Sequence, residues 1–220
     1  MYITQQEKFL SSLEASHGQF YKAAVFGGPS LYFHKRALAD GQVGLPAFAE
    51  SSYAMLASWG MHRMGRGGAK MADFGGYEDS LRETWPTIKR LQGREPSAMT
   101  ATDWDDLKAT FLGIKAMQSA FSLVATSKVL AHALPTLVPP VDRQYTIKFL
   151  YGSRVLPKNI DGEWDLLKNF LEFFFYPVLR EERFQRAFAQ WQANCDRYPW
   201  DTSPLKTIDN LLVGHMRINT

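Results

Sequence analysis

The stretch TSKVLAHALPTLVPPVDRQYTIKFLYG, residues 126–152, contains two helix-forming patterns joined by a proline-rich turn. Apolar residues at helical spacing predict a helix over residues 122–134, which Pro135 ends. Asp142 is expected to cap a shorter second helix that finishes near Gly152. The stretch therefore places Lys128 and Asp142 on consecutive helices, on either side of one turn.

The same helical period continues outward through most of the 220 residues. Further helix starts carry residues that favour a cap or a first turn: Pro46, Thr102 with Asp105, and Ser203 with Pro204. Ranges 162–175 and 178–196 are predicted as two long helices that Pro177 separates. Alternating strand patterns are almost absent, so we expect an all-α fold of nine or ten helices in a single domain over residues 1–220.

Composition excludes several classes of protein. Apolar residues make up 45% of the chain and aromatic residues 14%, which is typical of a globular protein. The longest apolar runs fall far short of the roughly 18 residues of a transmembrane helix, so no membrane partner is expected. The N-terminus lacks a signal-peptide pattern and Cys195 is the only cysteine, which indicates a reducing, cytoplasmic compartment. Five scattered histidines suggest neither a metal site nor a cofactor site.

Charge is distributed unevenly along the chain. The net charge of +3 is too small to indicate a nucleic-acid partner by itself. Between residues 143 and 160, however, the chain carries Arg143, Lys148, Arg154 and Lys158 and no acidic residue. This segment directly follows Asp142, so it predicts positive surface next to the two helices of the quoted stretch.

Two interpretations of Lys128 and Asp142 follow from the residues alone. In the simpler one, Lys128 is exposed and Asp142 is a helix cap worth about 1 kcal/mol. In the other, an amine and a carboxylate from consecutive helices face one cleft and act on a substrate. Spacing does not decide between them.

A resemblance favours the second interpretation. The residues S127-K128-V-L-A-H, the loop LPTLVPPV and then D142-R143 resemble the catalytic region of helix-hairpin-helix DNA glycosylases. The resemblance is closest to the 8-oxoguanine-type members and their uncharacterised bacterial relatives. The C-terminal PLKTIDNLL, around Asp209, is similar to a terminal helix of those relatives. The likeness covers about residues 105–155 and this tail.

The resemblance implies a fold of two helical lobes with a cleft near residues 120–155, and excision of a damaged or modified base from DNA. Lys128 would attack the sugar and form a Schiff base, and Asp142 would stabilise positive charge on the sugar or move protons. Nucleic-acid contacts would come from Ser127, Arg143, Lys148 and Arg154.

One departure from the family keeps other functions open. The family hairpin before the lysine is rich in glycine, whereas residues 123–127 read LVATS. The absence of these glycines favours a non-enzymatic helical module that binds nucleic acid or a protein. A third hypothesis is a small-molecule pocket lined by aromatic residues such as Phe173–Phe175, Tyr176 and Trp191, for which a packed core is the simpler interpretation.

Overall fold

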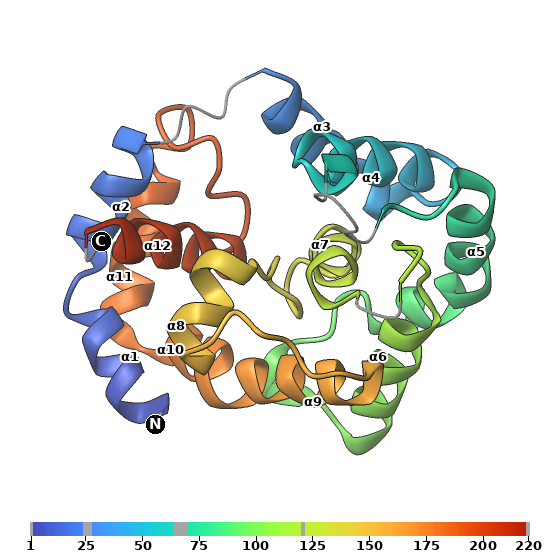
Figure 1. Cartoon of the computed structure of the whole chain (residues 1–220). Helices are drawn as coiled ribbons and strands as arrows, with labels where there is room; N and C mark the ends of the chain where they lie inside the picture. Colours follow the sequence, from blue (N-terminus) through green and yellow to red (C-terminus); the bar gives the residue numbers. More distant parts are fainter. Residues whose placement is uncertain (1, 24–27, 64–69, 120–121, 219–220) are drawn as a thin grey trace.

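The computed structural model describes residues 2–23, 28–63, 70–119 and 122–218, and these residues form an all-α protein (Figure 1). Its helices, in chain order, are α1 (Tyr2–Leu10), α2 (Leu13–Ala23), α3 (Pro29–Val43), α4 (Ala47–Ser58), α5 (Phe74–Leu91), α6 (Ala101–Gly113), α7 (Leu123–Ala133), α8 (Lys148–Tyr151), α9 (Ile160–Phe170), α10 (Tyr176–Arg180), α11 (Glu182–Gln192) and α12 (Pro204–Ile218). Two π-helical turns, η3 (Arg143–Ile147) and η4 (Leu171–Phe175), lead into α8 and α10. Short 3-10 turns occur at Met61–Arg63 and Pro96–Ala98. Within the described ranges the predicted absence of strands is confirmed, since the β pairing there is one isolated bridge between Met71 and Met117.

The two ends of the chain come together on one side of the molecule. There α12 packs against α2 and α11 also contacts α2, whereas α3–α6 lie on the opposite side (Figure 1). Helix α7 lies between these groups and packs against α3, α4 and α9. The helix that carries Lys128 is therefore central, and residues from both sides surround it.

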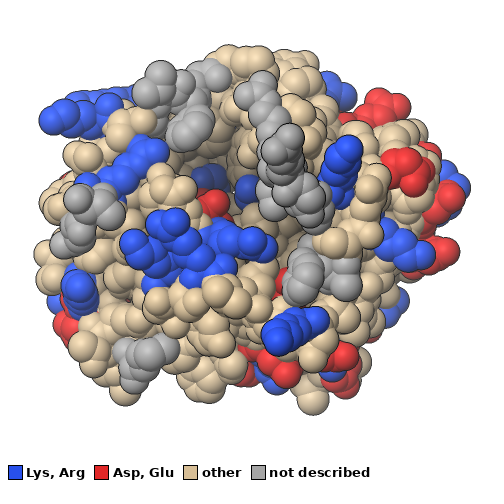
Figure 2. All heavy atoms as spheres, viewed as in Figure 1, with Lys and Arg blue, Asp and Glu red and all other residues tan. Residues whose placement is uncertain are grey.

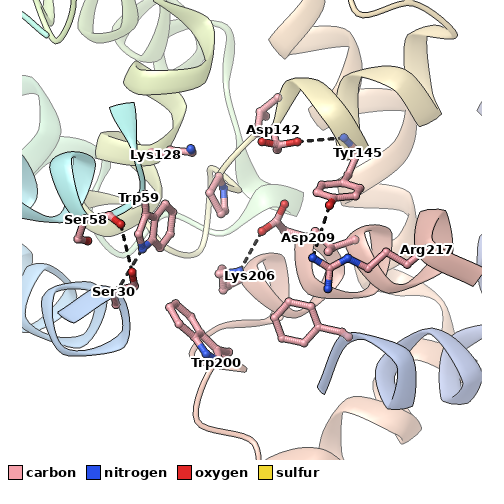
Figure 3. A pocket seen from close by; sticks show the side chains of 15 residues that line it. Ser30, Ser58, Trp59, Lys128, Asp142, Tyr145, Trp200, Lys206, Asp209 and Arg217 are labelled. Atoms are coloured by element: carbon pink, nitrogen blue, oxygen red, sulfur yellow. Dashed lines mark hydrogen bonds and ion pairs between the residues drawn. The ribbon is translucent and has the colours of Figure 1, made fainter. Parts of the chain in front are cut away.

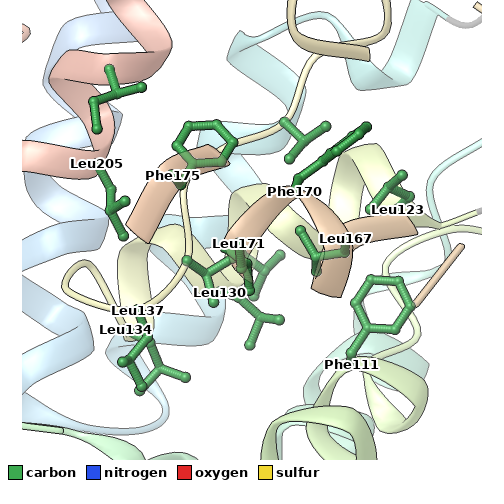
Figure 4. Close-up of a cluster of buried hydrophobic side chains, with 14 of the residues drawn as sticks. Phe111, Leu123, Leu130, Leu134, Leu137, Leu167, Phe170, Leu171, Phe175 and Leu205 are labelled. Carbon is green, nitrogen blue, oxygen red and sulfur yellow. The ribbon is translucent and has the colours of Figure 1, made fainter. Parts of the chain in front are cut away.

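Aromatic and leucine side chains around α7 form the centre of the core. Leu130, Phe170 and Phe175 are fully buried there (Figure 4). The aromatic run that opened the small-molecule hypothesis belongs to this core, because only Phe173 among its members is exposed. The same members do not line the pocket described below. The simpler interpretation of this cluster, a packed core, is the one that the structure supports.

Local signals place the helices that carry the candidate residues. Helix α7 spans Leu123–Ala133, close to the predicted range. Asp142 caps η3, as predicted, by accepting from the amides of Gln144 and Tyr145 at 2.7 and 3.0 Å. Helix α12 begins at Pro204, and the Ser203 hydroxyl accepts from the Lys206 amide at 3.1 Å.

Two predicted boundaries are wrong. The capping box lies at Thr100 and Asp103, two residues before the predicted pair, because the threonine–aspartate spacing occurs in both registers. Pro177 does not separate two helices, since α10 continues through it and the chain breaks at Glu181, where ψ is 122°. The π-helical turn η4 precedes Pro177 and Pro177 lies in the first turn of α10, where a missing amide hydrogen is tolerated.

Candidate functional site

A pocket of about 390 Å³ opens where α4, α7, α12 and the segment before η3 meet. Its volume falls within the range of roughly 300–1,000 Å³ that is usual for small-ligand sites. Figure 2 shows the hollow, with basic and acidic atoms on its floor. Lys128 and Asp142 both line it, and in Figure 3 their side chains lie on opposite walls. The two residues from the quoted stretch therefore face one pocket.

Lys128 extends from α7 into this pocket, and its amine has few polar neighbours. The residue is only 8% exposed, so the exposure that the simpler interpretation predicts for Lys128 is wrong. The Nζ atom lies 3.7 Å from Sδ of Met61 and 5.4 Å from the centroid of the Trp59 ring. Among the described residues it forms no ion pair within 4.0 Å. Burial lowers the pKa of Lys128, against the opposing pull of the carboxylates of Asp142 and Asp209.

Asp142 both caps η3 and lines the pocket. One carboxylate oxygen, Oδ1, caps η3, which fixes the side chain at the pocket wall. The residue is half-buried, so the carboxylate also remains accessible to a ligand. A helix cap and a pocket carboxylate are therefore not alternatives here.

A second lysine–aspartate pair lines the same pocket from α12. Lys206 Nζ lies 2.9 Å from Oδ2 of Asp209 and also donates to the side-chain oxygen of Asn210. The pKa of Asp209 is raised by its burial, although the positive charge of Lys206 opposes that rise. The resemblance pointed to the tail around Asp209, but not to Lys206. The spacing K-x-x-D within a predicted helix is the one sequence signal that joins them.

Two histidines that the sequence did not single out lie behind Lys128. His132 Nδ1 is 2.6 Å from the carbonyl oxygen of Lys128, and His132 Nε2 is 2.8 Å from His34 Nδ1. Because a carbonyl only accepts, His132 donates to it from Nδ1 and accepts from His34 at Nε2. Burial lowers the pKa of His34 well below its usual value, and it lowers the pKa of His132 to about 4. The pair is therefore neutral and helps to fix α7.

The predicted nucleic-acid contacts are divided between surface and core. Arg143 and Arg154 are exposed and Lys148 is half-buried. Figure 2 shows a group of basic side chains beside the hollow, over the part of the molecule that contains η3 and α8. Ser127 is fully buried and its hydroxyl is hydrogen-bonded to the backbone, so the prediction that it contacts nucleic acid does not fit this structure.

Residues 123–127, which the resemblance aligns with the family hairpin, are helical and form the beginning of α7. The amides of Ser122 and Leu123 both donate to Oε2 of Glu163, each at 2.8 Å. Glu163 is fully buried, so its carboxylate occupies the position that an anion takes at an open helix N-terminus. The missing glycines in LVATS thus coincide with a helix start that is capped from within the protein.

Comparisons with known proteins add no assignment: no family model matches the chain, and neither curated proteins nor solved structures yield a match. In the described part of the chain, no group of three or more His, Cys, Asp or Glu residues is arranged to hold a metal ion. None of the helices described here has both the length and the apolar character needed to cross a membrane. The side chains that line the pocket determine the chemistry that it can support. Those side chains include the amine of Lys128, which forms no ion pair among the described residues, the ion-paired Lys206, and the carboxylates of Asp142 and Asp209.

Proposed function

We propose that this protein is a DNA glycosylase-like enzyme that removes a damaged or modified base and forms a Schiff base through Lys128. The single observation that carries the proposal is the contrast between the two lysines in the pocket. Lys206 is ion-paired with Asp209, whereas Lys128 has no carboxylate within ion-pair distance among the described residues. An amine attacks carbon only through a free lone pair, so Lys128 is the nucleophile and Lys206 is not.

The reaction begins with a nucleotide turned out of the duplex into the pocket. The Lys128 nitrogen attacks the sugar carbon C1′, the bond from C1′ to the base breaks, and the base leaves with the electron pair and takes up a proton. A proton then passes from the nitrogen to the ring oxygen as the bond between C1′ and that oxygen opens, which gives the Schiff base. Removal of a proton from C2′ then expels the 3′ phosphate, and water releases the amine.

Asp142 faces the positive charge that develops on the sugar in this reaction. A carboxylate fixed by two backbone amides loses little freedom when it stabilises such a charge. The pocket volume of about 390 Å³ suits one turned-out nucleoside, not a duplex. Arg143 and Arg154, which are exposed, and the half-buried Lys148 would hold phosphates of the DNA backbone.

Borohydride trapping tests the proposal. The protein is incubated with duplexes that contain an abasic site or one of a panel of modified bases, and borohydride reduces any Schiff base to a stable adduct. We expect an adduct with the wild type, its mapping to Lys128 by peptide mass spectrometry, and its loss in Lys128→Met. Lys168→Met is the matched control, because Lys168 also lies against a tryptophan ring, that of Trp104, but outside the pocket. An adduct of equal yield in Lys128→Met would refute the proposed role.

A second function, a helical module without catalysis that binds nucleic acid through its basic surface or binds a protein partner, is favoured by the Glu163 cap, because a helix-hairpin-helix glycosylase needs this helix start open to the DNA backbone. The amides of Ser122 and Leu123 that would hold the DNA backbone in a helix-hairpin-helix protein are bonded to Glu163. In that case the duplexes bind with strong dependence on salt, but no substrate of the panel gives an adduct.

A further inference from the structure

The pocket contains a second lysine whose position is fixed from every side. Helix α12 places Lys206, Asp209 and Asn210 on one face, at spacings of three and four residues. Lys206 Nζ is held by Asp209 at 2.9 Å and by Asn210. It also lies 5.7–5.9 Å from three ring centroids, those of Phe20, Trp59 and Trp200. These contacts hold the amine of Lys206 in one position in the pocket.

Asn210 is itself held in place, which makes this arrangement rigid. Its Nδ2 donates to the carbonyl of Trp200 at 3.0 Å and to Oδ1 of Asp201 at 2.8 Å. The remaining oxygen of Asp201, Oδ2, is 2.7 Å from Nε2 of buried His17. A chain of buried polar contacts thus connects Lys206 to α2, and a fully bonded network of this kind fixes its members.

The two lysines share one aromatic ring. Lys128 Nζ lies 5.4 Å and Lys206 Nζ lies 5.9 Å from the centroid of Trp59. Of these two lysines, only Lys206 has a carboxylate within ion-pair distance among the described residues. Two ammonium charges beside one indole repel each other in a partly dry pocket, so the unpaired one loses its proton more readily.

We infer that Lys206 is a positioning residue that favours the neutral, nucleophilic form of the Lys128 amine, both by its own charge and by its ion pair with the Asp209 carboxylate. This inference rests on the proposed role of Lys128 as nucleophile. The groups that face Lys128 are Asp142 from the segment before η3, Asp209 and Lys206 from α12, and His132 from α7. The two carboxylates favour the charged amine, and Lys206 opposes them.

A purely structural role for Lys206, filling the space between three aromatic rings, makes a different prediction. Removing Lys206 and removing the charge of Asp209 would then disturb the same contacts and shift the pKa of Lys128 in the same direction. If charge is what matters, the two changes act in opposite directions on the pKa of Lys128. Lys206→Met leaves an uncompensated carboxylate and raises it, whereas Asp209→Asn leaves an uncompensated ammonium and lowers it.

Titration of Lys128 by NMR tests this without any substrate. Lysine labelled with ¹³C at Cε is incorporated into the full chain, and Lys128→Met identifies the resonance of Lys128. We expect the titration midpoint of that resonance to rise in Lys206→Met, to fall in Asp209→Asn, and to return close to the wild-type value in Lys206→Arg. Shifts of one sign in both variants, or none in either, would overturn the inference.

Two further measurements keep this test separate from that of the proposed function. Urea unfolding and far-UV circular dichroism check that each variant is folded, and Asp209→Asn alone still tests the sign if Lys206→Met does not fold. Borohydride trapping at pH 7 should slow about tenfold for each unit by which the midpoint rises. Opposite NMR shifts together with no adduct from the wild type would refute the glycosylase proposal and leave the role of Lys206 intact.

Discussion

The hydroxyl oxygen of Ser127 accepts a hydrogen bond from the backbone amide of Val141 at 3.0 Å, across the proline-rich turn. These residues immediately precede Lys128 and Asp142, so one bond joins the helix of the amine to the segment of the carboxylate. The hydroxyl also donates to the carbonyl of Val124 at 3.2 Å. A fully buried side chain therefore helps to set the separation between the two candidate residues.

Ser127→Ala should destabilise the fold by about 1–3 kcal/mol, because it leaves the fully buried Val141 amide without a partner. It should also slow trapping, since the segment of Asp142 is no longer fixed to α7. Urea unfolding measures the first effect and single-turnover trapping the second. Ser122→Ala is the matched control, because that buried hydroxyl has no partner among the described residues. Equal losses of stability in the two variants would contradict the role given to Ser127.

The close packing of α12 against α2 depends on a glycine. A Cβ atom on Gly214 of α12 would overlap the carbonyl oxygen of Ser16 and lie 2.8 Å from the carbonyl carbon. Gly214→Ala should therefore force α12 from α2 and destabilise the protein by about 1–3 kcal/mol or more. Because α12 carries Lys206 and Asp209, trapping should also decline. Gly18→Ala on the exposed side of α2, where a Cβ meets nothing within 4 Å, should instead stabilise by about 0.5–1 kcal/mol. Thermal unfolding of the two variants distinguishes these outcomes, and a similar change in both would refute the steric argument.

Local chemistry made part of the fold predictable. Asp142, Ser203 and Pro204 occupy the helix starts where their backbone preferences place them, and the apolar period locates α7 to within a residue or so. The failures also have local causes. Threonine–aspartate spacing occurs twice in residues 100–105, and only packing selects one register. A proline breaks a helix where the carbonyl four residues earlier needs an amide hydrogen as its donor. Pro177 lies in the first turn of α10, where the missing amide hydrogen is tolerated.

The site was predictable only in part, because most of it joins residues that are far apart in the chain. The family resemblance pointed to Lys128 and Asp142, and both do line one pocket. No local pattern could bring Trp59, Trp200 and Lys206 to the same place, since their meeting depends on how α4 and α12 pack around α7. The carboxylate of Glu163 at the start of α7 is likewise a contact across 40 or more residues.

The buried histidine pair predicts a loss of stability in acid. The folded pKa of His132 is about 4, below the value of about 6.5 for an unfolded histidine, and that of His34 is also lowered. Between these values the unfolded chain binds protons that the folded chain does not, so stability falls as pH decreases from about 6.5 to 4. Each histidine contributes up to about 1.4 kcal/mol per pH unit.

His132→Gln should lower by about one the number of protons that the unfolded chain binds in excess of the folded chain over this pH range. The raised pKa values of buried Glu163 and Asp209 act in the opposite direction, but they are present in both proteins and leave the difference between them unaffected. Urea unfolding at several pH values between 7 and 4 measures the two slopes. His62→Gln, at an exposed position, is the control. If His132→Gln and the wild type had the same slope, the neutral pair would not be the cause.

Binding to duplex DNA should depend on salt through Arg143, Lys148 and Arg154. None of these three forms an ion pair within the described structure, so their charges remain available to phosphates. If each contacts one phosphate, replacing all three by glutamine should reduce the slope of log K against log salt concentration by about 2.7. Fluorescence anisotropy with an abasic-site duplex at about 50–200 mM salt measures that slope.

The control for this measurement has the same change in net charge at another place. Arg82, Arg90 and Arg94 are each paired with a carboxylate of α5 or α6. Replacing these three by glutamine also removes three positive charges, yet it should leave the slope nearly unchanged because they neutralise protein carboxylates. Local charge beside the pocket, not net charge, then determines affinity. Equal slopes for the two triple variants would mean that DNA is attracted by overall charge alone, and the phosphate contacts assigned to the surface around η3 and α8 would be wrong.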